Sequence, residues 1–450
     1  MDRSTYRFLR FAYALRQWLT RRFTPLGLGV LVCLGISAII GMDTNQSLSY
    51  QVFTFLLALL SVSIAASLFI RYRLSATRIL PRFGTVGMPL KYRVVIQNKT
   101  KKPQKGLKLL ESFAGSFPGL QDFRGISPRS KNLMERRRQW LRIETQRRWA
   151  IASPVNLPTL SATDSTEVMG EITPLRRGLL QFKTLTIACP DPLGLFNACV
   201  TLSLPQSVLI LPKRYQLPPI QLPGGRRHQS GGVAMASSVG DSEEFRSLRE
   251  YRPGDAPRKI HWKSWAKVGK PIVKEEQDEY FVRHALILDT FQPESHSEVL
   301  EEAVAIAASL ACEVQTQESL LDMMFVGLEA HCFTVGRGLG QTERMLELLA
   351  SVVPCQDKSF DSILPVVQTR FSLLSGCICI LLTWDDARKS LVEQLQNMGI
   401  PTMVLVIEGE SFAPNAHRST THPAFECLKD AQSSVHILKL GQIQQGLLKL

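Results

Sequence analysis

Two uncharged apolar runs near the N-terminus are the strongest feature of the hydrophobic pattern. Residues 26–42 and residues 50–70 contain no Asp, Glu, Lys or Arg. A helix that crosses a bilayer needs about 20 such residues, within a range of about 17–25. Both runs fall within that range, and residues 43–49 are a short connection between them. The pattern therefore predicts two transmembrane helices that form a hairpin over residues 26–70.

Arginines lie on the outer side of each apolar run. They are Arg3, Arg7, Arg10, Arg16, Arg21 and Arg22 before the first run, and Arg71, Arg73, Arg78 and Arg82 after the second. Because basic residues favour the cytoplasmic side of a membrane, we expect a multi-pass protein of the cell inner (plasma) membrane with its N-terminus and body in the cytoplasm. A cleaved signal peptide is the alternative interpretation, but a second apolar run follows at once. Residues 6–22 also alternate aromatic residues with arginines, which is typical of a helix lying on an anionic leaflet.

The pattern changes to short β-favouring runs after the second apolar stretch. Polar and apolar residues alternate with a period near two over residues 90–97, and turn residues separate the runs. Spaced short strands of this kind predict a β-sandwich-like domain. The predicted strands are 90–97, 179–188, 200–204 and 207–211.

Strand-like and helix-like runs alternate in the last third of the chain. This order predicts a C-terminal α/β doubly wound domain with a mostly parallel sheet, in which ligands bind at the carboxyl ends of the strands. Asp289, Asp385 and Asp386 lie at those ends. The predicted strands are 285–288, 323–326, 377–383, 403–407 and 435–438, and the predicted helices are 299–312, 341–353 and 387–398.

The charge is strongly basic, with 53 Lys and Arg against 39 Asp and Glu. Residues 119–148 carry much of the excess positive charge. This basic segment is interpreted as a solvated loop, as a surface facing anionic lipid or as a nucleic-acid patch. Since the anchor already implies a lipid partner, we expect no nucleic-acid binding. The 9 cysteines form no C-x-x-C pair and no zinc-like spacing, which indicates reduced cysteines. Cys377 and Cys379 are expected on one face of a strand.

Residues 245–280 have the most distinctive sequence, FRSLREYRPGDAPRKIHWKSWAKVGKPIVKEEQDEY. Residues 252–255 predict a turn. Asp255 is placed to cap a helix over residues 256–266 that Gly269 ends, and a strand follows at 272–276. The crowded charges are interpreted either as an internal ion-pair network or as a binding surface.

This stretch resembles the signature of the bacterial family called domain of unknown function 58. The matching residues are Leu248, Arg249, Tyr251, Pro253, Gly254, Asp255, Arg258, Ile260, Trp262, Lys263 and Glu275. A second likeness is Arg176-Arg177-Gly178 followed by Asp191-Pro192-Leu193-Gly194-Leu195-Phe196. The resemblance implies a membrane hairpin, a β-rich segment and a domain similar to the von Willebrand factor type A fold. It also implies association with a MoxR-type AAA+ ATPase, while the family's own activity is not established.

The pattern and the resemblance together divide the chain into six parts. We expect a basic tail, a transmembrane hairpin, a β-rich domain, a linker, the signature segment and a type A-like domain, at residues 1–25, 26–70, 71–216, 217–242, 243–280 and 281–450. The interaction residues that the resemblance implies are Arg249, Tyr251, Pro253, Gly254, Asp255, Arg258, Trp262, Lys263 and Glu275.

A metal site of the type A kind is the alternative for ligand binding. Its D-x-S-x-S motif holds Mg²⁺ through one carboxylate and two hydroxyls, with a later Thr and Asp. Asp289 is present, but Phe291 and Pro293 occupy the two serine positions. Thr383 and Asp385 are the candidate later ligands. Because the motif is degenerate, we expect no metal or cofactor.

Enzyme motifs are missing from the sequence. It contains no G-x-S-x-G, no H-E-x-x-H and no Gly-Lys-Ser/Thr phosphate loop, and the glycines at 336, 338 and 340 lack dinucleotide spacing. We therefore predict a membrane-anchored cytoplasmic scaffold or adaptor that is not an enzyme. A metal-dependent ligand-binding module that uses Asp289 and Asp385, or an unrecognised enzyme, is the alternative.

Overall fold

The chain forms a mixed α/β structure of several parts in a computed structural model. Two compact units comprise residues 1–211 and 212–450. The structure describes residues 3–40, 47–69, 73–115, 148–218, 245–253, 255, 257, 260–276, 283–294, 297–316, 320–327, 329–335, 339–409 and 433–450. The basic segment at 119–147 and the glycines at 336 and 338 lie outside these residues.

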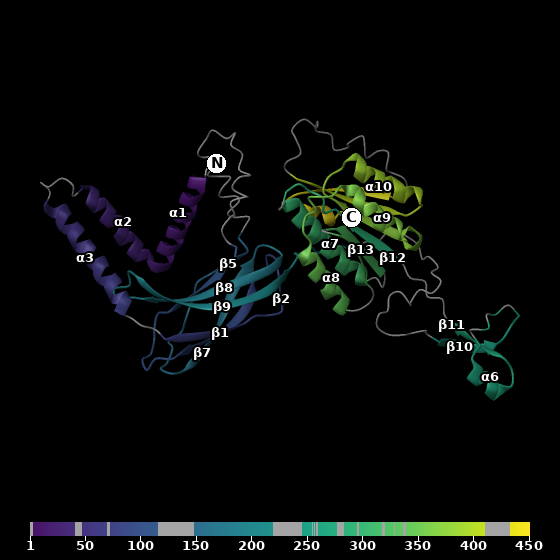
Figure 1. Cartoon of the computed structure of the whole chain (residues 1–450), viewed down its shortest axis with the longest axis horizontal. Coiled ribbons are helices and arrows are strands. Elements are labelled where there is room, and N and C mark those ends of the chain that lie inside the picture. Colours follow the sequence, from purple (N-terminus) through teal and green to yellow (C-terminus); the bar gives the residue numbers. More distant parts are fainter. Residues whose placement is uncertain are drawn as a thin grey trace. The chain divides into compact units, whose positions relative to one another are not determined.

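Three helices begin the first unit, α1 (Arg3–Arg22), α2 (Pro25–Ile40) and α3 (Ser47–Phe69) (Figure 1). The stretch Leu48–Leu68 of α3 is apolar and long enough to cross a membrane, with a mean hydropathy of 2.0. Helix α2 has 16 residues. At 1.5 Å per residue it is about 24 Å long, shorter than a hydrocarbon core of about 30 Å. Within the described residues one helix has spanning length, so the prediction of two transmembrane helices is not confirmed.

Two sheets share one core in the rest of the first unit. The first sheet has the strand order β1-β3-β7-β5 and the second β2-β9-β8-β4-β6. Alternating burial along β3 places Tyr92, Val94 and Ile96 in a core that also contains Phe182 and Ile187. The strands are β1 (Leu74–Ile79), β2 (Phe83–Thr85), β3 (Leu90–Asn98), β4 (Lys108–Phe113), β5 (Ala150–Ala152), β6 (Val155–Asn156), β7 (Ser165–Pro174), β8 (Gly178–Pro190) and β9 (Asn197–Leu211).

Strand β9 corrects one expectation. Residues 200–204 and 207–211, predicted as separate strands, belong to this single strand of 15 residues. The register with β8 shifts between Phe182 and Thr184, which pair with Gln206 and Ser203. Pro205 lies at that irregularity, where a missing N–H interrupts no ladder bond. A proline therefore does not separate the two runs.

The second unit contains a six-stranded sheet with the strand order β14-β13-β12-β15-β16-β17. All neighbours pair in parallel except β14, an antiparallel edge strand that the pattern did not predict. The strands are β12 (Arg283–Leu288), β13 (Leu320–Val326), β14 (Ala330–Val335), β15 (Gly376–Leu381), β16 (Thr402–Glu408) and β17 (Ser433–Lys439). The helices are α7 (Glu298–Thr316), α8 (Leu339–Ser351), η2 (Phe360–Ile363), α9 (Leu364–Gln368), η3 (Phe371–Leu373), α10 (Asp386–Asn397) and α12 (Ile443–Leu447).

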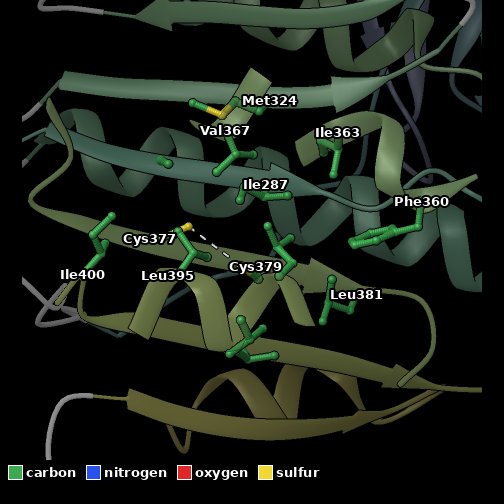
Figure 2. Close-up of a cluster of buried hydrophobic side chains, with 14 of the residues drawn as sticks. Ile287, Met324, Phe360, Ile363, Val367, Cys377, Cys379, Leu381, Leu395 and Ile400 are labelled. Carbon is green, nitrogen blue, oxygen red and sulfur yellow. Dashed lines mark hydrogen bonds between the residues drawn. The ribbon is translucent and has the colours of Figure 1, made fainter. Parts of the chain in front are cut away.

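Central strands β12, β13 and β15 are buried along their whole length, because helices cover both faces of the sheet. Figure 2 shows the core on one face, where Ile287, Met324 and Leu381 pack with Phe360 and Leu395. The Sγ atoms of Cys377 and Cys379 lie 3.7 Å apart on this face, which confirms their expected common side.

Residues 212–216 belong to the second unit, although the expected β-rich domain extended to residue 216. The backbone N–H of Tyr215 donates to Ser309 Oγ on α7 at 2.8 Å, and its hydroxyl donates to Glu302. Burial and this hydrogen bond raise the pKa of Tyr215 above its usual range. This short strap is therefore fixed to α7 by hydrogen bonds.

Candidate functional site

The signature segment forms a small hairpin that carries one short helix. Strands β10 (Phe245–Glu250) and β11 (Ile272–Glu276) pair antiparallel, and α6 (Trp262–Val268) lies between them in the chain. Gly269 ends α6 in the left-handed conformation, at φ 76°, and donates its N–H to Trp265 O, as expected. Gly254 and Arg258 lie outside the described residues, and Glu275 is described only through its backbone pairing with Ser247.

Asp255 fixes the turn rather than a helix end. Its carboxylate accepts two hydrogen bonds of 2.7 Å from the Arg249 guanidinium and one of 2.8 Å from the Arg252 N–H. These donors, the Arg249 guanidinium first, lower the pKa of Asp255 to about 2. Helix α6 begins at Trp262 with His261 at its N-cap position, so Asp255 does not cap this helix. Arg249 and Asp255 therefore form an ion pair within the turn.

The helix begins later than expected. Ile260 forms a β-bridge with Val273, and the His261 N–H donates to Ile272 O at 2.8 Å. These backbone contacts hold Ile260 and His261 beside β11, and α6 begins at Trp262 rather than at residue 256. His261 precedes the first turn, where its Nδ1 lies 2.6 Å from Ser264 Oγ.

Aromatic and basic side chains of the segment face solvent. Trp262 is 64% exposed and stacks on Trp265 with their ring centroids 5.2 Å apart. Lys263 and Lys267 on the same helix are exposed. Tyr251 is also exposed, in the turn. An exposed tryptophan among basic residues is typical of a protein-binding surface.

The carboxyl edge of the six-stranded sheet holds Asp289, which has no exposed surface. The N–H groups of Phe291 and Leu382 each donate to its carboxylate at 3.0 Å. Arg388 Nε donates to the same carboxylate at 2.7 Å. Burial raises the pKa of Asp289, and the Arg388 guanidinium and the two N–H donors act against that rise.

Arg388 brings together the two acids that were candidate metal ligands. Its guanidinium also donates to Asp385, and it lies 4.7 Å from the centroid of the Phe360 ring. Thr383 is exposed. Among the described residues no group of three or more His, Cys, Asp or Glu side chains is arranged to hold a metal. A guanidinium therefore lies where a cation between the two carboxylates would bind, and these residues do not fit Mg²⁺ while Arg388 remains there.

Sequence reasoning missed Arg388. Its only local signal is the spacing of three residues from Asp385, which caps α10 by accepting the Arg388 N–H at 3.0 Å. The contact with Asp289 joins residues 99 positions apart, and no local pattern indicates it.

The Asp191–Phe196 loop was singled out by resemblance, and the structure gives it a role in the first unit. Asp191 accepts hydrogen bonds from the N–H groups of Leu195 and Phe196 at 2.7 and 2.9 Å. Its other oxygen accepts the hydroxyl of Ser63 on α3 at 2.6 Å. Thr24, before α2, donates its hydroxyl to Gly194 O at 2.6 Å. The loop therefore connects the N-terminal helices to the sandwich.

Comparisons with known proteins reach only part of this mixed α/β chain. Residues 247–363 match the family model described as "Protein of unknown function DUF58". The uncharacterized protein YeaD of Bacillus subtilis (strain 168) is 27% identical over 182 residues, which are 40% of this chain and 44% of that relative. The chain thus spans under half the length of this relative.

Solved structures give weaker similarities. Two structures of the CARDB domain of a Pyrococcus furiosus protein are similar to 31% of this chain, at 10% identity and a TM-score of 0.17. The match covers 94% of the solution structure and 93% of the crystal structure, which is a complex with di-metal ions. A Salmonella alpha-2-macroglobulin mutant covers 39% of this chain and 9% of its own, at 12% identity and a TM-score of 0.18. Scores this low support no conclusion about this fold.

Proposed function

We propose that this chain is a membrane-anchored cytoplasmic scaffold of the domain of unknown function 58 family, with residues 245–276 as its partner-binding surface. The α/β domain would be a type A-like support. The partner we propose is a MoxR-type AAA+ ATPase, following the family resemblance. The proposal assigns no catalytic residue, cofactor or nucleic acid to the chain.

The surface of α6 is the observation that supports this proposal. Val273 is the buried hydrophobic residue of the described signature segment, whereas Trp262, Leu248 and Val268 are all exposed. Tryptophan is enriched among residues that dominate binding energy. The exposed lysines beside it complement an acidic partner surface.

Direct binding tests the proposal. The full chain in lipid nanodiscs is immobilised, and the affinity of the purified MoxR-type ATPase is measured against the wild type and a Trp262→Ala/Lys263→Glu variant. We expect the variant to bind about 30-fold more weakly, the effect of one 2 kcal/mol hot spot.

Leu448→Ala/Lys449→Glu is the matched control, because Leu448 and Lys449 are also an exposed apolar and basic pair in sequence. It should bind like the wild type. Equal loss in both variants, or no binding by the wild-type chain, would contradict the assigned surface.

A further inference from the structure

Helix α1 has one exposed apolar face and no acidic residue. Phe11, Leu15 and Trp18 are 64%, 43% and 49% exposed. Their spacing of four and three residues places them on one side of the helix. The surrounding Arg7, Arg10 and Arg16 are exposed. An apolar stripe within a purely basic helix complements an anionic lipid surface.

Other arginines of α1 fix the helix to the sandwich. Arg21 Nη2 donates to Ser112 Oγ at 2.8 Å, and the Arg22 guanidinium lies 5.9 Å from the centroid of the Phe196 ring. Trp18 contacts Phe23 and Phe196 edge to face. These contacts hold the C-terminal end of α1, including Trp18, the last residue of the exposed stripe.

The level of α1 relative to α3 follows from the Asp191–Phe196 loop. Phe196 contacts Trp18 of α1, and Asp191 accepts the hydroxyl of Ser63 on α3. Ser63 lies five residues before the end of the apolar stretch Leu48–Leu68. At 1.5 Å per residue, this contact lies about 8 Å along α3 from the end of that stretch, so the loop and the C-terminal end of α1 lie near the end of the span.

We infer that the exposed face of α1 binds the anionic lipid surface of the leaflet that α3 leaves. The inference rests on the proposed membrane anchor and adds a second lipid contact of defined chemistry. The apolar stripe inserts among the acyl chains while Arg7, Arg10 and Arg16 contact lipid phosphates. One span and one interfacial helix then fix the orientation of the sandwich on the membrane.

Hydrogen exchange on the full chain in liposomes tests the inference. We expect amides of α1 to exchange more slowly in vesicles of phosphatidylcholine and phosphatidylglycerol than in phosphatidylcholine alone. An Arg7→Gln/Arg10→Gln/Arg16→Gln variant should lose about 100-fold of that protection, because each arginine near an anionic surface contributes a factor of roughly five.

Three exposed lysines of the sandwich supply a control of equal charge change. Lys91→Gln/Lys101→Gln/Lys105→Gln should keep the wild-type lipid dependence. A Phe11→Ser/Leu15→Ser variant should also lose protection, which separates insertion from charge attraction alone.

Three results would overturn the inference. In the first, amides of α1 exchange equally fast in both kinds of vesicle while those of α3 stay protected. That result would support the membrane anchor but contradict lipid binding by α1. In the second, protection of α1 rises with protein concentration instead of anionic lipid, which assigns the face to a second copy of the chain. If alkaline carbonate removes the chain from vesicles, the anchor itself fails, and the inference fails with it.

Discussion

Replacing Arg388 by methionine tests the interpretation of the sheet edge most directly. Arg388→Met keeps an unbranched side chain of similar length but removes the guanidinium from Asp289, which has no exposed surface. Two backbone N–H donors then remain for the carboxylate. Removing one partner of a buried ion pair costs about 3–5 kcal/mol, because the remaining charge is uncompensated.

The size of this effect sets the assay. In a unit of this size, each kcal/mol lowers the melting temperature by about 2–4 °C, so we expect a decrease of roughly 6–20 °C. Because a chain of several units need not unfold in one step, hydrogen exchange of β12 and β15 is the more specific measurement. Both strands should lose protection, while the sandwich strands keep theirs.

A double-mutant cycle separates the ion pair from a packing effect. Asp289→Asn/Arg388→Met removes both charges and should be less destabilised than the sum of the two single variants. Additive effects, or a loss below about 1 kcal/mol in Arg388→Met, would refute the reasoning. Millimolar Mg²⁺ should leave the stability of the wild type unchanged, because Arg388 occupies the carboxylate. A stabilisation by Mg²⁺ would restore the metal-dependent alternative.

Two further predictions concern a close approach and a turn. A Cβ at Gly27 would lie 2.0 Å from Leu195 O, so Gly27→Ala should destabilise the protein by about 1–3 kcal/mol and speed hydrogen exchange in the Asp191–Phe196 loop. Gly29→Ala is the control, because a Cβ there would meet nothing within 4 Å. Equal effects of the two variants would contradict the close contact. Arg249 lowers the pKa of Asp255 to about 2 in the folded chain, against a pKa of about 3.9 for an unfolded aspartate. The ion pair therefore contributes its full stabilisation above about pH 3.9 and loses it as the pH falls towards 2. Carboxyl ¹³C NMR, assigned with Asp255→Asn, should give that pKa; a value near 4 would show that the pair does not form.

The residues that sequence reasoning placed well follow local rules. Gly269 ends α6 because it adopts a positive φ, and the run at Cys377–Cys379 forms a buried strand because its neighbours are apolar. The signature residues Arg249 and Asp255 also meet, since only six positions separate them. Their pairing with each other, in place of a helix cap, depended on the hairpin that brings β10 and β11 together.

The sequence by itself determined the apolar helices, the alternating strands of the sandwich and the α/β order of the second unit, since each depends on side chains within a few residues of one another. Only the tertiary structure decided that Arg388 forms an ion pair with Asp289, 99 positions away. The same holds for the hydrogen bond that Asp191 accepts from the hydroxyl of Ser63, 128 positions away. The physical reason is that a buried carboxylate must find donors wherever the fold brings them. No periodicity of the chain records which distant residue supplies them.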